Sequence, residues 1–412
     1  MRLRFPEVLR KMAFVCLYFL KSNGYKKALS FINYRNGGRK NLKARVILPL
    51  VEMAHYKFIQ HLLVAKALEL RGAEIVVLIC NEGLNTCEIR SSINFDRDPC
   101  WRCRFGKDKI LPMFGFQIVT LHEIKQSLSI KWPLTNYKMK KFRDETGFFL
   151  DRCVADSIIR HQYGRDTDNV EQKLGAIEDI YTSWEAAKYL HKQYKPTFIL
   201  GYMVAYSEWE PIYRFFQKVN VPFRLLTSTP FSNKSQMLDW PELYWTPDRF
   251  RKYVSSRKLK NSLSPEEEFV LDDFLNKRFS GNDDVMKSQG VARSLKQTQN
   301  IVNDHESTKT IALFPNLHWD VGVSELNTIF PSMFDWLCDT IEYLGNKSNV
   351  RVLLRLHPVE AVYSKQGGTS VLDLLRDRFA EMPNNLIVIP AEAPFSSYQL
   401  FPQIDIGITY NG

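Results

Sequence analysis

Two stretches of this chain alternate short apolar strands with helices that carry apolar residues on one side. In the first stretch we expect a strand at Arg45–Leu50, a helix at Tyr56–Leu70 and, after Gly72, a second strand at Glu74–Cys80. A strand, a helix and another strand in this order form a crossover unit, which joins parallel strands. The pattern therefore predicts an α/β fold that is built on a parallel sheet.

The alternation continues along the first stretch and starts again after residue 308. Further strands of the first stretch are expected at Phe116–Leu121, Thr197–Tyr202 and Phe223–Thr227, and helices at Thr146–His161, Val170–Gln193 and Glu208–Val219. Strands of the second stretch are expected at Ile311–Phe314, Arg351–Leu356, Leu386–Pro390 and Ile404–Tyr410, and helices at Pro331–Leu344, Val371–Met382 and Ser396–Phe401. We therefore expect two doubly wound, Rossmann-like sheets, each with helices on both faces.

With 412 residues, the chain is long enough for two domains. We place a basic arm at residues 1–44, a first α/β domain at 45–235, a polar linker with a helix at 236–307 and a second α/β domain at 308–412. The chain stops on an apolar strand that ends in Tyr-Asn-Gly, where a loop and a helix should follow, so we expect the second domain to be incomplete. Two such domains face each other across a cleft at the carboxyl ends of their strands, where ligands of this fold bind.

The excess positive charge lies in the first 45 residues, which hold 12 Lys and Arg and one acidic residue, whereas the other 44 basic and 44 acidic residues balance. A near-neutral body argues against nucleic acid as a partner. The apolar run Met12–Leu20 is too short to span a bilayer, so the arm fits a helix lying on the anionic inner-membrane surface. A buried helix with a solvated basic face and an uncleaved signal-like anchor are the alternatives. We expect a cytoplasmic protein, which would be peripheral to the inner membrane if the arm forms a helix on the membrane surface.

The seven cysteines are odd in number and scattered, which indicates a reducing compartment rather than a disulfide framework. Four of them, Cys80, Cys87, Cys100 and Cys103, follow the second strand. The last two have the C-x2-C spacing of zinc sites, whereas the first two are spaced more loosely. Two hypotheses stay open: a structural zinc ion, or free thiols in a loop near the cleft. In the second case, basic and aromatic residues between the cysteines would grip an anionic ligand. These residues are Arg90, Arg97, Trp101, Arg102 and Arg104.

Polar side chains follow the strand Arg351–Leu356 of the second stretch. Arg355, His357, Pro358 and Glu360 lie at its carboxyl end. The planar fork of an arginine and the ring of a histidine supply donors for phosphate or carboxylate, and the proline fixes the direction of the loop. These residues predict a phosphate site, with structural hydrogen bonds at the strand end as the alternative.

Two further loops carry polar residues at strand ends. Asn316, His318 and Asp320 follow the strand Ile311–Phe314 and suit the recognition of hydroxyl groups, and the His and Asp would form an orienting pair. Ser396 and Ser397 open the short helix after Leu386–Pro390, whose N-terminus would hold a phosphate. Helix capping alone also accounts for both serines.

Residues 310–412 resemble a known family. The runs FPNLHWD, FPSMFDWL, RVLLRLHPVE and IDIGITYNG are similar to those of the bacterial capsule polysaccharide synthesis family, which includes transferases that use CMP-activated sugars such as Kdo. The resemblance implies an inverting glycosyltransferase of the GT-B fold, with the nucleotide-sugar donor held by the second domain. It implies that His357 and Pro358 contact the donor nucleotide, and it adds Asn411 to the donor-binding positions.

A base is expected in the first domain, because the acceptor hydroxyl must lose its proton. Glu82, in the turn Asn81-Glu82-Gly83 after the second strand, resembles the short acidic-Gly motif that carries the base in sialic-acid and Kdo transferases. His55 and Glu52, in the loop after the first strand, are the alternatives. Tyr202, Ser207 and Glu208 follow another strand, and we expect them to line the acceptor site.

The sequence lacks the motifs G-x-x-x-x-G-K-[ST], G-x-G-x-x-G and H-E-x-x-H, which argues against P-loop ATPases, common dehydrogenases and zincins. The first hypothesis is a glycosyltransferase that needs no cofactor, takes a nucleotide sugar as substrate and acts on a glycan or glycolipid acceptor. The second is another GT-B-like enzyme, either a nucleotide-sugar 2-epimerase or a polyol-phosphate transferase. The third is a non-catalytic partner in capsule assembly or export.

Overall fold

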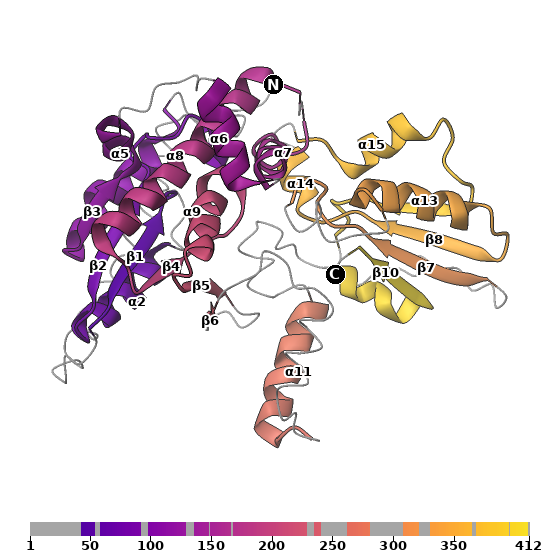
Figure 1. Ribbon diagram of the computed structural model, residues 1–412. Helices are drawn as coiled ribbons and strands as arrows, with labels where there is room; N and C mark the ends of the chain where they lie inside the picture. Colours follow the sequence, from indigo (N-terminus) through magenta and orange to yellow (C-terminus); the bar gives the residue numbers. More distant parts are fainter. Residues whose placement is uncertain are drawn as a thin grey trace. The chain divides into compact units, whose positions relative to one another are not determined.

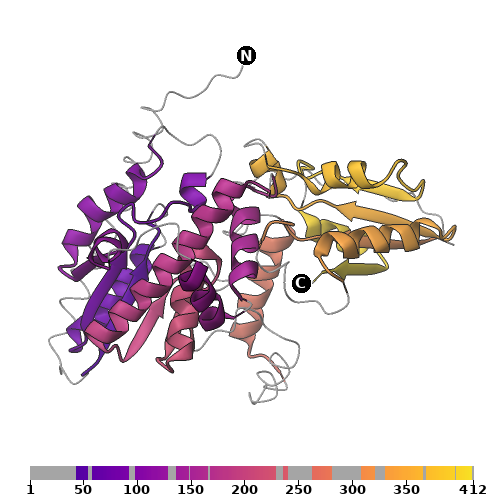
Figure 2. The same cartoon turned by 45° about the horizontal axis from the view of Figure 1, so that its top comes forward.

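The computed structural model describes residues 43–53, 58–91, 98–128, 136–147, 149–165, 168–228, 235–239, 262–280, 308–320, 330–364, 368–394 and 396–410. The chain divides into two compact units, drawn in Figures 1 and 2. The first comprises the described residues within 1–158, 168–227 and 235–241, and the second those within 159–167, 228–234 and 242–412. The expected basic arm up to residue 42, most of the expected linker, His55 and Asn411 lie outside the described residues.

The first unit is built on a sheet of six strands in the order β3-β2-β1-β4-β5-β6. The strands are β1 (Arg45–Leu50), β2 (Glu74–Ile79), β3 (Gln117–Thr120), β4 (Phe198–Gly201), β5 (Phe223–Ser228) and β6 (Ser235–Asp239). β1 pairs in parallel with both β2 and β4, and β2 with β3 and β4 with β5 are parallel too. The order runs outward from β1 in one direction and then reverses at β4, as it does in a Rossmann fold.

Helices cover both faces of this sheet. α2 (Phe58–Leu70) packs one apolar side, including Ile59 and Leu62, against alternate residues of β1 and β2 such as Val46 and Val77. The long helix α8 (Val170–Tyr194) and α9 (Tyr206–Lys218) run side by side over the other face in Figure 1. β1 and β2 are therefore buried on both sides, which explains why they read as continuous apolar runs.

Shorter helices connect these elements. They are α3 (Glu88–Ser91), α4 (Trp101–Phe105), the π-helical turn η1 (Gly106–Ile110), the 3-10 turn η2 (Leu111–Met113), α5 (Leu121–Ser127), α6 (Asn136–Thr146) and α7 (Phe149–His161). α5 begins with a capping box, in which Thr120 and Glu123 satisfy each other's backbone amides. α4 runs directly into η1, so that residues 101–110 form one continuous helical segment.

The second unit is built on a four-stranded sheet in the order β10-β7-β8-β9, in which all three neighbouring pairs are parallel. Its strands are β7 (Lys309–Phe314), β8 (Val350–Arg355), β9 (Leu386–Ile389) and β10 (Ile406–Thr409). Its helices are α11 (Pro265–Phe279), α13 (Met333–Gly345), α14 (Glu360–Tyr363), α15 (Val371–Arg378) and the 3-10 helix η5 (Ser397–Gln403). The order again reverses at the first strand of the unit, so this sheet is also Rossmann-like.

The structure confirms the predicted fold class of two Rossmann-like parallel sheets. It also places a segment that the sequence pattern did not assign to the second unit. Tyr163, which follows α7, packs in one apolar cluster with Leu317, Trp319 and Val359 and accepts a hydrogen bond from the Thr369 amide at 3.1 Å. Within the described residues, no helix has both the length and the apolar content that crossing a bilayer requires.

Candidate functional site

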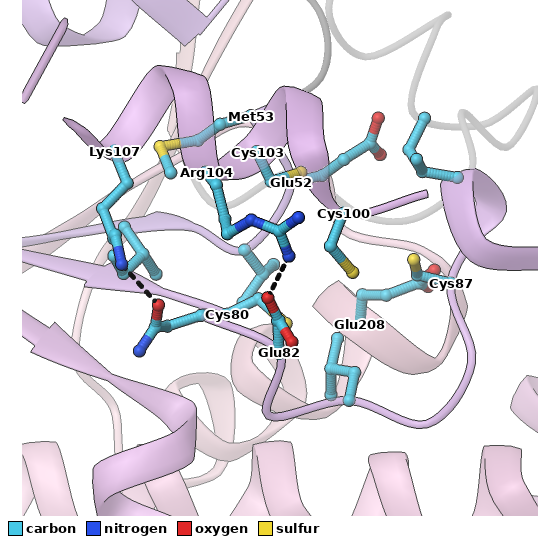
Figure 3. Close-up of a pocket in the computed structure, with 15 residues that line it drawn as sticks. Glu52, Met53, Cys80, Glu82, Cys87, Cys100, Cys103, Arg104, Lys107 and Glu208 are labelled. Atoms are coloured by element: carbon cyan, nitrogen blue, oxygen red, sulfur yellow. Dashed lines mark hydrogen bonds and ion pairs between the residues drawn. The ribbon is translucent and has the colours of Figure 1, made fainter. Parts of the chain in front are cut away.

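A pocket lies at the carboxyl edge of the first sheet, where the strand order reverses between β1 and β4. Figure 3 shows its walls, which come from the loops after β1 and β2, from α4 and η1, and from the first turn of α9. It holds about 550 Å³ of space, part of it open to solvent. Its lining residues are Val51, Glu52, Met53, Ile79, Cys80, Asn81, Glu82, Leu84, Cys87, Ile89, Cys100, Cys103, Arg104, Lys107 and Glu208. Rossmann-like sheets bind their ligands at this edge, so the pocket is the candidate site.

The turn after β2 has an unusual backbone. Asn81 and Glu82 both have positive φ angles, of 47° and 64°, although neither is a glycine. Each such residue costs of order 1–3 kcal/mol unless its surroundings hold it, and residues of this kind gather at functional sites. The next residue, Gly83, packs so closely on α5 that a Cβ there would lie 2.7 Å from the backbone nitrogen of His122. The sequence Asn-Glu-Gly therefore fits a turn that presses the backbone against a helix start.

Glu82 stands at the rim of the pocket with 43% of its side chain exposed. Its Oε1 accepts a hydrogen bond from Nη1 of Arg104, whose Nη2 donates to Asp98. Lys107 donates to Oδ1 of Asn81 at 2.9 Å. The carboxylate predicted as the base is thus accessible, and its partners come from the helical segment that faces it (Figure 3).

A buried carboxylate holds the loop that continues from this turn. Asp179 on α8 is fully buried, and its two oxygens accept four hydrogen bonds from Asn85 and Thr86, at 2.6 to 3.2 Å. Burial raises the pKa of Asp179 to about 7, although the hydrogen bonds oppose that rise. Glu208 on α9 is also buried and accepts a hydrogen bond from the Glu88 amide at 3.1 Å. The loop from 84 to 88 is therefore tied to α8 and to α9.

The four cysteines of the sequence motif all line this pocket and are free thiols. Burial raises the pKa of Cys80 to about 11 and that of Cys103 to about 12, and it raises the pKa of Cys87 well above its ordinary value. Thiols are thus neutral at these positions at pH 7, and they behave as small apolar groups. In the described part of the chain, no three His, Cys, Asp or Glu side chains are grouped so that they could hold a metal ion. The zinc hypothesis and the free-thiol hypothesis both stay predictions.

Arginines between the cysteines mostly bind protein groups. Arg90 donates to the carbonyls of Leu84 and Asn85 at 2.9 and 3.4 Å, and Arg102 lies over the ring of Trp101. Arg97 lies outside the described residues. The hypothesis that these arginines grip an anionic ligand is thus not supported for Arg90, because its guanidinium braces the loop.

The alternative bases are placed less clearly. Glu52 lines the pocket beside the thiols, where its negative charge contributes to the raised pKa of Cys87 and of Cys103. His55 cannot be compared with it, because residues 54–57 lie outside the description. Ser207 and Glu208 are both buried at the start of α9, and of these two only Glu208 lines the pocket.

In the second unit, Arg355 and Glu360 point into the protein, which corrects their interpretation as phosphate ligands. Arg355 is 2% exposed, and its Nη1 donates to the carbonyl oxygen of Pro390 at the end of β9. Glu360 is 1% exposed, and its Oε2 accepts from the amide of Val371 at 3.2 Å, at the start of α15. Burial raises the pKa of Glu360 to about 7. Both side chains therefore join neighbouring elements of the sheet, as the structural alternative expected.

His357 is half-buried at the end of β8, next to Pro358. Its Nδ1 accepts a hydrogen bond from the Val359 amide at 3.2 Å. Burial lowers its pKa to about 4, although the nearby carboxylate of Asp320 opposes this. His357 is thus a neutral ring at pH 7, and it lies within the electrostatic influence of the exposed Asp320.

Two residues of the loop after β7 have structural contacts. Asn316 donates to the carbonyl of Tyr410 at 2.9 Å and so ties the ends of β7 and β10 together. His318 packs on Gly164, where an added Cβ would lie 2.0 Å from its ring nitrogen Nε2. Burial lowers the pKa of His318 to about 4, so its ring is neutral. The orienting pair of His318 and Asp320 stays a prediction.

Ser396, just before η5, fits the capping alternative. Ser396 is 2% exposed, its hydroxyl donates to the carbonyl of Arg278 at 3.1 Å, and it accepts from the Tyr398 amide at 3.3 Å. Ser397 is the first residue of η5, the 3-10 helix at the place of the expected short helix. Ser396 therefore caps η5 and joins it to the end of α11.

Sequence reasoning missed two residues that shape the pocket in the first unit. Lys107 lies in a segment without a clear periodic pattern, and only the structure shows that it reaches Asn81. Asp179 stands in the polar positions of a long helix, 94 residues from Asn85 along the chain. No pattern in the sequence around Asp179 shows that it is buried or which loop it binds.

Comparison with known proteins gives no family. No protein-family model and no curated protein matches the chain. Among solved structures, it is similar to a CDPS from Fluoribacter dumoffii, with 12% identity over 49% of this chain and 93% of that chain and a TM-score of 0.30. It is also similar to a UDP-GlcNAc 2-epimerase from Neisseria meningitidis bound to UDP-GlcNAc, with 10% identity over 89% of this chain and 77% of that chain and a TM-score of 0.21. It is similar to the glycosyltransferase SnogD from Streptomyces nogalater too, with 11% identity over 90% of this chain and 77% of that chain and a TM-score of 0.21. Similarities this weak carry no argument about function.

Proposed function

We propose that this chain is a glycosyltransferase that moves a sugar from a nucleotide-sugar donor to a hydroxyl group of a capsular polysaccharide or of its lipid-linked precursor. The observation that carries the proposal is the position of Glu82. It combines an accessible carboxylate, a held left-handed turn and a pocket at the switch point of a Rossmann-like sheet. The resemblance of residues 310–412 to the capsule polysaccharide synthesis family supplies the reaction class.

In this proposal Glu82 is the general base. The acceptor hydroxyl attacks the anomeric carbon of the donor, the bond from that carbon to the nucleotide phosphate breaks, and the hydroxyl proton passes to Glu82. A single displacement of this kind inverts the anomeric centre. The thiols and apolar side chains that line the pocket limit competing water, so that positioning and local electrostatics dominate catalysis.

The donor side of the proposal rests on the loop after β8. His357 and Pro358 are the candidates for contact with the nucleotide, and Asp320 is near enough to influence the ring electrostatically. Because the His357 ring is neutral at pH 7, it would act by hydrogen bonding rather than by charge. Arg355 is left out of this role, since it binds the carbonyl of Pro390.

The proposed surroundings are cytoplasmic, with the basic residues near the N-terminus at the anionic surface of the inner membrane. The supporting observation is the charge of the first 45 residues. Binding of the full chain to vesicles of anionic lipid, with neutral vesicles as the control, tests this. Equal binding to both would count against it.

The test of the reaction starts with the donor. Thermal-shift measurements with CMP, UDP, GDP and CDP identify the nucleotide, and the corresponding nucleotide sugars are then assayed for transfer with polysaccharide and glycolipid acceptors. Glu82→Gln should lower kcat by about 10²–10⁴-fold and leave nucleotide binding unchanged, because a general base contributes about this much. Glu171→Gln, at an exposed position on α8, is the matched control and should be as active as the wild type.

Two results would contradict the proposal. If kcat of Glu82→Gln is within threefold of the wild type, Glu82 is not the general base. A threefold change corresponds to about 0.7 kcal/mol in the height of the barrier. Conversion of the nucleotide sugar in the absence of any acceptor would favour a 2-epimerase instead.

A further inference from the structure

One helical segment holds two consecutive residues of the turn that carries Glu82. α4 (Trp101–Phe105) runs into η1 (Gly106–Ile110), and Arg104 and Lys107 are three residues apart on it. Arg104 binds the Glu82 carboxylate, and Lys107 binds the side chain of Asn81. Figure 3 shows both contacts as dashed lines along one side of the pocket. Arg104 and Lys107 belong to one continuous helical segment, so a single element makes both contacts.

The segment is well anchored in the core of the first unit. Ile110 and Leu111 at its end are 3% and 1% exposed, and both belong to the main apolar cluster. A Cβ at Gly106 would lie 3.1 Å from Cβ of Met53 and 3.4 Å from the ring of Phe58, so the helix packs closely on the loop after β1 and on α2. π-helical turns such as η1 are rare and recur at functional sites.

The turn needs this support because its backbone is strained. The positive φ angles of Asn81 and Glu82 are kept only where the surroundings over-determine them. Gly83 is fixed from the other side by its close packing on α5. What remains free is the direction of the Glu82 side chain, and Arg104 determines it.

Arg104 is itself held from two sides. Its Nη1 donates to Oε1 of Glu82, and its Nη2 donates to Asp98. The planar fork of an arginine can make two such contacts at a fixed angle, whereas the ammonium group of a lysine acts as a point charge. Because Oε1 of Glu82 is engaged, Oε2 is the oxygen that would take the proton of the acceptor.

We propose that Arg104 is a positioning residue that fixes the Glu82 carboxylate for proton removal, with Lys107 holding the backbone turn beneath it. This inference rests on the proposed function, in which Glu82 is the base. It predicts a loss in the chemical step rather than in substrate binding, because misplacement of a reacting group by about 1 Å costs on the order of 10²-fold.

The experiment measures kcat and KM for the acceptor in full-length variants, with circular dichroism melting as the control for folding. Arg104→Gln should lower kcat by about 10–10²-fold with KM within about threefold of the wild type. Arg104→Lys keeps the charge and should recover part of kcat. Lys109→Gln is the matched control, because Lys109 is an exposed lysine on the same π-helical turn, and it should leave both constants unchanged.

A double variant separates this proposal from the function on which it rests. If Arg104 acts through Glu82, Glu82→Gln combined with Arg104→Gln should be no slower than Glu82→Gln alone. Full activity of Arg104→Gln beside an inactive Glu82→Gln would overturn the role of Arg104 and leave the function standing. Full activity of both single variants would overturn the function itself.

Two further outcomes also decide the matter. A raised KM with an unchanged kcat would mean that Arg104 binds substrate directly, which contradicts a positioning role. If Arg104→Gln does not fold, Asp98→Asn serves in its place, since it releases only one side of the Arg104 fork. Its kcat should fall less than the kcat of Glu82→Gln, with unchanged melting, and no change in kcat would overturn the proposal.

Discussion

Replacing Asp179 by asparagine should remove a pH-dependent loss of stability from the first unit, although it also removes two of the four hydrogen bonds that Asp179 accepts. The side chain is fully buried, and its pKa is raised from 3.8 to about 7 by burial, against the opposing effect of those bonds. The folded protein therefore keeps this proton up to about pH 7, whereas the unfolded chain releases it near 3.8. Between these values the folded state binds more protons, so the free energy of unfolding falls as the pH rises.

The size of this effect follows from the two pKa values. A rise from 3.8 to about 7 is about three pH units, and each unit corresponds to about 1.36 kcal/mol, so the wild type loses up to about 4 kcal/mol between pH 4 and pH 7. Asparagine has nearly the same shape and cannot ionise. Its NH2 group cannot accept the two hydrogen bonds that one oxygen of Asp179 accepts, so Asp179→Asn should be less stable than the wild type near pH 4. Because asparagine does not titrate, the difference in stability should shift in favour of the variant by up to about 4 kcal/mol between pH 4 and pH 8.

Hydrogen exchange of the α8 amides, measured by mass spectrometry from pH 5 to pH 8.5, reports on the first unit by itself. Asp168→Asn is the control, because Asp168 precedes the same helix and its side chain is 95% exposed. That control keeps Asp179 and should therefore show the same trend with pH as the wild type. If the difference in stability between Asp179→Asn and the wild type does not change between pH 5 and pH 8, Asp179 does not ionise in the folded state over this range, and the reasoning about the sign is wrong.

Three further results are expected. Glu360→Gln should stabilise the second unit above about pH 7 by up to about 3 kcal/mol, because burial raises the pKa of Glu360 from 4.5 to about 7; exchange of the α15 amides tests this. Arg152→Met should cost about 1.5–3 kcal/mol in denaturant unfolding, since it removes the α7 partner of the fully buried Glu210 carboxylate, which keeps Arg214 at 3.0 Å. Alkylation of Cys80 and Cys103 by iodoacetamide should be slow at pH 7 and rise about tenfold per pH unit up to pH 10, because burial raises their pKa values to about 11 and 12. Rapid labelling at pH 7 would contradict that account.

The sheets could be predicted from the sequence because each strand is a short apolar run between helices. Val46 to Leu50 and Ile75 to Ile79 are buried on both faces, so a continuous run of apolar residues is what the fold needs there. The turn with Asn81 and Glu82 could also be placed, since it follows directly from the end of a predicted strand. Local pattern therefore located the carboxyl edge of the sheet, and the resemblance of Asn81-Glu82-Gly83 to an acidic-Gly motif indicated Glu82 as the base.

The partners that shape the pocket could not be predicted, because they come from distant parts of the chain. Asp179 reaches its loop across more than 90 residues, and nothing in the sequence around it specifies Thr86 as its partner. Arg104 and Lys107 lie in a segment with no regular apolar spacing, since part of it is a π-helical turn rather than a regular α-helix. Periodicity detects elements that bury one face, and it gives no information on which polar side chains of two elements meet.

Arg355 shows why a strand end alone does not identify a binding residue. It is the last residue of β8, a strand that is buried on both faces, so its side chain enters the layer between sheet and helix in which Leu353 also lies. There it binds the carbonyl of Pro390. His357, two positions later, has left the strand and is half-buried. A polar residue at the last position of a buried strand therefore tends to hydrogen-bond to the neighbouring strand. A polar residue in the loop beyond the strand can reach a ligand. By the same rule, Glu82 lies three residues past the end of β2, and its carboxylate is the one that reaches the rim of the pocket.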